Sequence, residues 1–231
     1  MVVNNLTEEI LRELDADGIR SVFLKYTKMA FESIPKIDEP RILDIGCGTG
    51  MPTLELARLS NGEITGIDID QKALDKLSTK IKNLGLLEKI KVYNRSIYNT
   101  KFKDEAFDIL WEEGVTHLLD LKKTLTECNR ILKLHGFMVS GEANNWADRK
   151  LKYFPRFGFK LIKEIPWRSK CWWTDYYAPL EEKINTLREK YGNIDNLKEI
   201  QRHITEIEMV KKNPAGFDCI TYVFQKIKKV K

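Results

Sequence analysis

Long apolar runs are absent from the sequence. No stretch approaches the roughly 18 consecutive apolar residues that a membrane-spanning helix needs. The first residues, MVVNNLTEEILREL, carry acids where a secretory signal would carry basic residues followed by an apolar run. We therefore expect a cytoplasmic protein with no membrane association.

Cysteine is scarce and scattered, and its four positions contain no C-x-x-C pair. This spacing fits neither a zinc site nor a disulfide framework, so no metal is expected. Charge of one sign is not gathered into blocks either, since 39 basic residues are mixed with 34 acidic ones. The exception is the KIKKVK run, Lys226 to Lys231, which we interpret as a solvated end because basic charge alone is a weak signal for nucleic-acid binding.

Short apolar runs alternate with longer amphipathic stretches along most of the chain. This alternation is typical of βαβ units, and it predicts an α/β fold with a doubly wound, seven-stranded, mostly parallel sheet. The expected strands are 41–46, 63–68, 89–94, 107–111, 137–142, 159–167 and 217–227. The expected helices between them are 51–60, 71–85 and 117–132.

The chain is expected to form a single domain, 1–231. It would consist of an N-terminal helical segment at 1–39, a ligand-binding core at 40–142 and a helical, lid-like insertion at 171–214 before the last strand. In the N-terminal segment, a helix over 19–34 would place Val22, Tyr26, Met29 and Ala30 on one face.

The stretch RILDIGCGTG, residues 41–50, carries the strongest functional signal. A predicted strand runs into Gly46, Gly48 and Gly50 just before a predicted helix. Glycine lets a ligand approach the backbone, and a helix N-terminus offers unpaired N–H groups. The G-x-G-x-G spacing differs from the G-x-G-x-x-G of dinucleotide sites, and the nearby Asp44 suits a cationic ammonium better than a pyrophosphate.

With D-I-G-C-G-T-G in place, the chain resembles the class I S-adenosylmethionine-dependent methyltransferases. The resemblance covers roughly residues 40–142, including FDILWEEGVTHLLD (107–120) and LTECNRILKLHGFMVSGE (125–142). It implies a Rossmann-like methyltransferase fold with S-adenosylmethionine as cofactor and S-adenosylhomocysteine as product. A more specific likeness is to small-molecule-type, type 11-like methyltransferase domains.

The resemblance also implies the cofactor-binding residues. Asp68, at the end of the second strand, would hold the ribose hydroxyls, and Ile69 would lie against adenine. Where the family often has a G-D-A-like turn, this chain has Arg95, Ser96 and Ile97. The complete set expected to bind cofactor is Asp44, Gly46, Cys47, Gly48, Gly50, Asp68, Ile69, Ser96, Ile97 and Glu112. Cys47 is interpreted as a small space-filling residue within this turn.

Catalytic and substrate-binding residues are less clearly marked. Glu112 and Glu113 stand at the carboxyl end of the fourth strand, where one of them would contact the ligand or cap the following segment. Glu113 and His117 are the candidate catalytic residues, and Asp108, inside the strand, is expected to be structural. The candidate substrate-binding residues are Tyr26, Trp172, Trp173 and Tyr176. Together with Tyr177, the last three form a ring-rich segment that either packs the insertion or encloses an acceptor.

Three functions fit these features. The first is methyl transfer to a small molecule by in-line displacement, with the aromatic insertion near the acceptor. The second is methyl transfer to RNA or protein, although no N-P-P-Y-like motif follows the fourth strand, where W-E-E-G stands instead. The third is a non-catalytic S-adenosylmethionine-binding regulator.

Overall fold

The structure is a computed structural model that describes residues 2–144 and 151–230, with the side chains of residues 2–5 and 116 left out. The strands are β1 (Arg41–Ile45), β2 (Glu63–Asp68), β3 (Ile90–Asn94), β4 (Phe107–Glu113), β5 (Leu132–Ala143), β6 (Phe159–Pro166) and β7 (Cys219–Lys226). The α-helices are α1 (Val2–Leu14), α2 (Ala16–Arg20), α3 (Leu24–Glu32), α4 (Met51–Leu59), α5 (Gln71–Asn83), α6 (Leu121–Ile131), α8 (Ala178–Tyr191) and α9 (Lys198–Lys212). Short helical turns are η1 (Ser21–Phe23), η2 (Ile97–Asn99), η3 (Thr116–Leu118), η4 (Leu151–Phe157), η5 (Trp172–Tyr177) and η6 (Pro214–Phe217).

The chain divides into two compact units. The first comprises the residues up to Phe23 together with Trp167–Asp218, and the second comprises Leu24–Pro166 and Cys219–Lys231. In the first unit, α1 packs on α8 and α2 packs on η5, so segments from both ends of the sequence share one body. The second unit contains the whole sheet.

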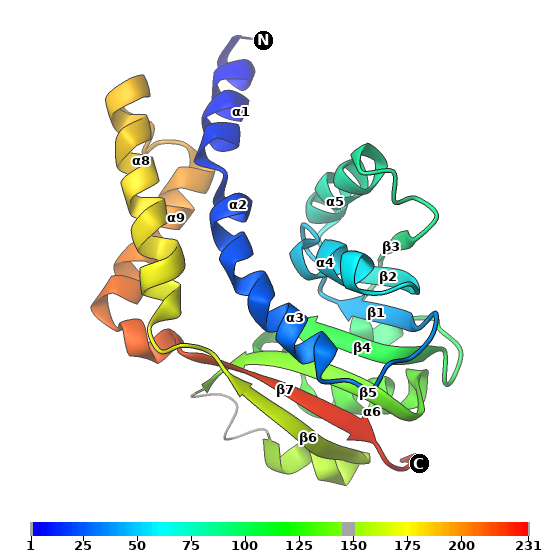
Figure 1. Cartoon of the computed structure of the whole chain (residues 1–231). Coiled ribbons are helices and arrows are strands. Elements are labelled where there is room, and N and C mark those ends of the chain that lie inside the picture. The colour runs from blue at the N-terminus through cyan, green and yellow to red at the C-terminus, as the bar shows by residue number, and fades with distance from the viewer. Residues whose placement is uncertain (1, 145–150, 231) are drawn as a thin grey trace. The chain divides into compact units, whose positions relative to one another are not determined.

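The sheet confirms the predicted fold class. Its seven strands run in the order β3-β2-β1-β4-β5-β7-β6, and β7 is antiparallel to both of its neighbours (Figure 1). Strands β1 to β5 pair in parallel. The strand order reverses between β1 and β4, and the crevice at the carboxyl ends of such a pair is where open α/β sheets bind ligands. The glycine turn after β1 therefore lies at the expected edge.

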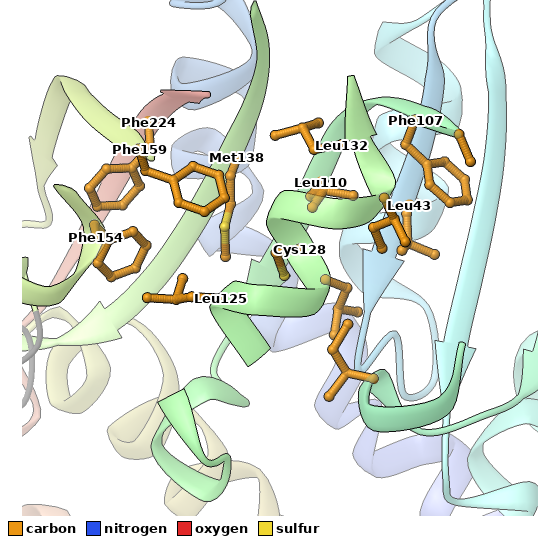
Figure 2. Packing of buried hydrophobic residues seen from close by; sticks show 14 of the residues in the cluster. Leu43, Phe107, Leu110, Leu125, Cys128, Leu132, Met138, Phe154, Phe159 and Phe224 are labelled. Atoms are coloured by element: carbon orange, nitrogen blue, oxygen red, sulfur yellow. The ribbon is translucent and has the colours of Figure 1, made fainter. Parts of the chain in front are cut away.

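The core forms because strands buried on both faces are almost wholly apolar. The main cluster joins residues of β1, β4 and β5 to α6 and to a group of phenylalanines (Figure 2). Phe154 and Phe224 stack with ring centroids 3.9 Å apart. Each such side chain contributes about 1.5–3 kcal/mol when fully buried. The cluster fixes β4 and β5, whose carboxyl ends carry the acids of the candidate site.

The predicted single helix over 19–34 is wrong in its phase. The structure interrupts it at η1, and α3 starts afresh at Leu24. Tyr26 and Ala30 are buried as expected, but Val22 is 38% exposed and Met29 is 50% exposed. The tighter turn at η1 breaks the helical period, so Val22 is not in phase with α3. Met29 is exposed for a different reason, because the buried side of α3 consists of Tyr26, Thr27 and Ala30.

The prediction that Lys226 to Lys231 form a solvated tail is wrong for its first residue. Lys226 belongs to β7 and is 1% exposed. Its Nζ donates to the backbone oxygens of Asn129 and Leu132, at 2.6 Å each. Burial lowers the pKa of Lys226. The lysines that follow, Lys228 and Lys229, are exposed as predicted.

Candidate active site

The glycine turn links β1 to the N-terminus of α4. The backbone N–H groups of Gly46 and Cys47 both donate to the Ile67 oxygen, at 2.8 and 3.1 Å, which fixes the turn against β2. Gly48 has φ 51°, and a Cβ built there would meet nothing nearer than a backbone oxygen 4.0 Å away. At Gly50, by contrast, a Cβ would lie 2.1 Å from Leu77 Cδ1. The turn is therefore packed at Gly50 and open at Gly48.

Asp68 is joined directly to this turn. Its Oδ2 accepts a hydrogen bond from the Gly48 N–H at 2.8 Å, and its Oδ1 accepts one from the Asp70 N–H, also at 2.8 Å. Asp70 in turn caps α5 through its side chain. The carboxylate at the end of β2 is thus held beside the open part of the glycine turn.

Asp44 lies within β1 and is 1% exposed. Thr53 Oγ1, on α4, donates to Asp44 Oδ2 at 2.5 Å. Burial raises the pKa of Asp44 to about 7, the Thr53 hydrogen bond opposes this shift, and the charges of Glu113, Glu112 and Asp68 add to it. The acid is therefore poised to change its charge near neutral pH.

Cys47 is 4% exposed, and its Sγ would lie 2.9 Å from a Cβ built at Gly66. The thiol fills the space above the β2 backbone that Gly66 leaves, and burial raises its pKa. Cys47 thus presents its backbone to the turn and its side chain to the interior. A buried neutral thiol is a poor nucleophile.

The residues expected near adenine differ in exposure. Ile69 is 75% exposed, whereas Ile97 is 4% exposed and belongs to the core cluster. Ser96 Oγ accepts a hydrogen bond from the Tyr98 N–H at 3.2 Å and begins η2. Sequence reasoning did not select Tyr98, 47% exposed, or Leu118, 73% exposed. Both are large side chains on the turns that follow β3 and β4, and the Tyr98 hydroxyl accepts a hydrogen bond from the Asp120 N–H at 2.6 Å. Their position after these strands was the available signal.

The two glutamates at the end of β4 point to different partners, as neighbouring residues of a strand do. Glu112 is 1% exposed, and it accepts hydrogen bonds from the Val115 N–H and from Ser140 Oγ, both at 2.8 Å. It holds the turn after the strand, which is the capping role considered for this pair. Glu113 Oε1 accepts hydrogen bonds from Trp111 Nε1 at 2.7 Å and from Thr27 Oγ1 at 2.9 Å.

His117 and Asp108 lie at opposite ends of the β4 region. His117 is exposed on η3. Asp108 accepts hydrogen bonds from the Arg41 N–H at 3.0 Å and from Lys133 Nζ at 2.8 Å. Asp108 thereby ties β4 to β1 and β5 at the amino end of the sheet, and the structural role predicted for it is confirmed.

The aromatic residues of the insertion do not all lie together. In η5, a π-helical turn, the wider spacing brings residues four or five apart onto one face. Trp172, Tyr176 and Tyr177 accordingly form one ring cluster with Phe23 and Trp167. Within it, the Phe23 and Trp172 centroids are 4.6 Å apart.

Trp173 stands apart from that cluster, with Lys211 Nζ 5.5 Å from its ring centroid. Tyr26, the fourth candidate for substrate binding, is 5% exposed and belongs to the second unit rather than to the first. Trp172 and Tyr176 are thus brought together, while Trp173 and Tyr26 each have a different environment.

Other kinds of site are not indicated in the part of the chain that the structure describes. Within it, no group of three or more His, Cys, Asp or Glu residues is arranged to hold a metal ion. No helix among these residues is long and apolar enough to cross a membrane. A cavity of about 100 Å³ lies between the end of α3 and the α4–β2 connection, near Pro40 and Ile109. It shares no residue with the glycine turn.

Residues 43–140 match the family described as "Methyltransferase domain". Over this segment the chain is similar to methyltransferase domains. The segment contains the glycine turn, Asp68 and both glutamates of β4, and domains of this class use S-adenosylmethionine. The matched segment thus includes the residues described above at the carboxyl edge of the sheet.

Curated relatives match this chain over segments of different length. An uncharacterized protein of Haemophilus influenzae is 32% identical over 105 residues, which are 44% of this chain and 42% of that protein. A demethylmenaquinone methyltransferase of Staphylococcus aureus is 26% identical over 180 residues, 77% of this chain and 70% of that protein. The chain spans about two fifths of the length of the first curated relatives that it matches.

Among solved structures, the [4+2]-cyclase SpnF superposes with a TM-score of 0.71 at 19% identity, over 87% of this chain and 80% of that one. At this identity the likeness shows the fold alone. Because that neighbour is described as a cyclase, the methyltransferase domain fold by itself does not fix the reaction.

Proposed function

We propose that the protein is an S-adenosylmethionine-dependent methyltransferase that transfers a methyl group to a small-molecule acceptor by in-line displacement. The observation that carries the proposal is the hydrogen bond from the Gly48 N–H to Asp68, which joins the open glycine turn to the β2 acid. The demethylmenaquinone methyltransferase, which aligns with most of this chain, supports a small-molecule acceptor.

The residues at the sheet edge fit the parts of this cofactor. Asp68 would accept hydrogen bonds from the ribose hydroxyls, and exposed Ile69 would cover adenine. The open backbone at Gly48 and the acid Asp44 would receive the amino-acid end, whose ammonium suits a carboxylate. When bound, the cofactor supplies a methyl group already activated on a sulfonium. The protein must therefore mainly align the acceptor and exclude water.

An acceptor that loses a proton needs a base, which typically contributes 10²–10⁴-fold to the rate. Glu113 and His117 are the candidates. Glu113 Oε1 already accepts two hydrogen bonds, whereas His117 is exposed. For acceptor binding, Tyr26, Trp172, Trp173 and Tyr176 stay predictions, to be tested by substitution.

Binding of the cofactor without methyl transfer is the second candidate function. The observation that favours it is the close fold match to a protein described as a cyclase rather than a transferase. Under this alternative the glycine turn and Asp68 bind the cofactor as proposed, but no methylated product forms.

Calorimetric titration with S-adenosylmethionine tests the binding step. We expect Asp68→Ala to weaken binding at least tenfold, because the ribose hydroxyls lose a charged acceptor. Asp75→Ala is the matched control, since it removes an exposed carboxylate on α5, beyond the turn. Equal affinity of wild type and Asp68→Ala would overturn the assignment of the site.

A transfer assay separates the candidate functions. Purified protein and methyl-labelled cofactor are incubated with the small-molecule, protein and RNA fractions of a cell extract. The label transferred to each fraction is then counted. Label in a small-molecule compound that chromatography separates from the cofactor supports the proposal, and label in protein or RNA contradicts its acceptor class. Binding of the cofactor with no label in any fraction favours the second candidate.

A further inference from the structure

Glu113 is held by two donors that converge on a single oxygen. Trp111 Nε1 and Thr27 Oγ1 reach Oε1 at 2.7 and 2.9 Å, the first from the same strand and the second from α3. Both donor residues are buried, Trp111 at 0% and Thr27 at 2% exposed. Hydrogen bonds to a carboxylate are strongest when it is ionised, so this arrangement suits a fixed negative charge.

The strand beside Glu113 is shaped to admit its side chain. In the sheet register Glu113 pairs with Gly141 of β5. A Cβ at Gly141 would lie 3.2 Å from Glu113 Cγ, closer than most such contacts in proteins. A glycine at this position leaves room for the side chain in its observed orientation. Thr27, Trp111 and Gly141 thus form a cradle that determines where the charge sits.

This charge lies beside the glycine turn. In the sheet register Ile45 of β1 pairs with Glu112 of β4, so Glu113 stands level with Gly46, the first residue of the turn. The Glu113 carboxylate also adds more to the raised pKa of Asp44 than Glu112 or Asp68 does. Asp44, in turn, precedes the turn by one residue, Ile45. A cation bound at the turn would therefore be attracted by Glu113.

Cofactor and product differ in the charge at sulfur, which a nearby carboxylate attracts when it is positive. S-adenosylmethionine carries a sulfonium, whereas S-adenosylhomocysteine carries a neutral thioether, and both have the same adenosine, ammonium and carboxylate. Sinefungin replaces the methylated sulfonium with a carbon that bears an amine, so it keeps a positive charge. These three ligands separate recognition of charge from recognition of shape.

We propose that Thr27 is a positioning residue of the cofactor site, which holds Glu113 so that its charge favours the charged cofactor over the uncharged product. The inference rests on the proposed function, because it takes S-adenosylmethionine as the ligand. It assigns a role to α3, which precedes the segment that matches the methyltransferase family.

The experiment is calorimetric titration of each variant with the three ligands. Thr27→Val removes the hydroxyl while keeping the side-chain shape, Thr27→Ser restores a hydroxyl, and Glu113→Gln removes the charge. We expect Thr27→Val and Glu113→Gln to weaken binding of S-adenosylmethionine and sinefungin about 5- to 10-fold, a usual range for one partly screened charge pair. Binding of S-adenosylhomocysteine should change less than about twofold, and Thr27→Ser should resemble wild type.

Asp108→Asn is the charge control. It removes a carboxylate from the same strand, but about 16 Å away along it at the rise of an extended chain. The ratio of the two affinities, cofactor to product, should stay at the wild-type value in this variant. Thermal unfolding of every variant identifies any that fails to fold, and Glu113→Gln keeps the test decisive if Thr27→Val is such a variant.

Two failures are distinguishable. If wild type binds the ligands but Thr27→Val keeps the wild-type ratio of cofactor to product affinity, the role of Thr27 is wrong and the proposed function stands; if Glu113→Gln keeps that ratio as well, the Glu113 charge does not discriminate between the two ligands. If wild type binds neither cofactor nor product, the proposed function and this inference are both overturned.

Discussion

The backbone N–H of Gly48 donates to Asp68 Oδ2 across 2.8 Å, although the two residues are separated by a whole helix in the sequence. Gly48 contributes backbone with open space around it, and Asp68 contributes a carboxylate. The contact also orients Asp68 before any ligand arrives, because both of its oxygens accept backbone hydrogen bonds. An oriented carboxylate loses less freedom on binding than a mobile one would.

Gly48→Val should abolish cofactor binding while leaving the protein folded. The valine would occupy the open space of the turn, and the positive φ at position 48 would add a local strain of about 1–3 kcal/mol. Gly85→Val is the matched control, since Gly85 also has a positive φ, of 67°, and open space around it, but lies after α5. Titration and thermal unfolding would check this. Equal loss of binding in both variants would mean that strain, and not the site, is responsible.

Gly50→Ala, unlike Gly48→Val, should act mainly on the fold and lower the free energy of unfolding. A Cβ there would lie 2.1 Å from Leu77 Cδ1, so the buried Leu77 side chain or α5 has to shift, and the φ of 89° adds backbone strain. Overpacking of this kind typically costs about 1–3 kcal/mol. Urea unfolding measures the loss. A Gly50→Ala protein as stable as wild type would show that the turn is not packed against α5.

Asp44 should make stability depend on pH. Its pKa is about 7 in the folded protein against a usual 3.8, so between these values the folded state holds a proton that the unfolded state has lost. The free energy of unfolding therefore falls as pH rises from about 4 to about 7. Asp44→Asn should remove this fall and be more stable than wild type by about 2–4 kcal/mol at pH 8.

Urea unfolding of both proteins at pH 4 and pH 8 tests the Asp44 prediction. At pH 4 the two should differ little, because the folded carboxyl is then neutral in wild type as well. Asp75→Asn, which changes an exposed carboxylate, should give the same difference from wild type at both values of pH. A constant gap between Asp44→Asn and wild type would contradict the raised pKa.

Trp172 and Trp173 should differ in their effect on the first unit. Trp172→Ala removes a ring that lies 4.6 Å from Phe23 and 5.7 Å from Tyr176, whereas Trp173 is half-buried with Lys211 Nζ 5.5 Å from its ring centroid. We expect hydrogen exchange to rise in α2 and η5 for Trp172→Ala and to stay near wild type for Trp173→Ala. Matching exchange in the two variants would mean that the cluster does not hold these segments together.

His117 and Glu113 should be separable once an acceptor is known. If His117 is the base, His117→Ala lowers kcat about 10²–10⁴-fold and removes the acid limb of the pH–rate profile. Glu113→Gln would then act mainly through affinity for the cofactor. A His117→Ala enzyme with an unchanged profile would exclude this residue as the base.

The sequence was informative where the signal is local. The apolar strands, the glycine turn and Asp68 are each recognisable within a few residues, so the fold class and the place of the glycine turn at the carboxyl end of β1 could be predicted. The period of the helix before β1 could not be predicted, because the break at η1 has no local signal in the sequence. Phe23, in that break, is 5% exposed and packs against Trp167 and Trp172, which are far along the chain.

The finer features of the site depend on contacts between distant residues. Thr27 and Glu113 are 86 positions apart, and nothing in either local pattern indicates their hydrogen bond. The burial of Lys226 was hidden for the same reason, since its partners lie on α6 and at the start of β5. The composition identified a basic tail, but it did not indicate that the backbone oxygens of Asn129 and Leu132 accept hydrogen bonds from Lys226.

The position of β7 has a consequence for the order in which the protein can be assembled. Within the described chain β6 pairs with β7 alone, and β7 also completes the pairing of β5. On the ribosome, β6 therefore emerges well before any strand that can cover it, and it exposes Leu161 and Ile162 even in the finished fold. Until Cys219–Lys226 has been synthesised, the sheet ends at β5, and newly made chains carry an open edge available to other chains.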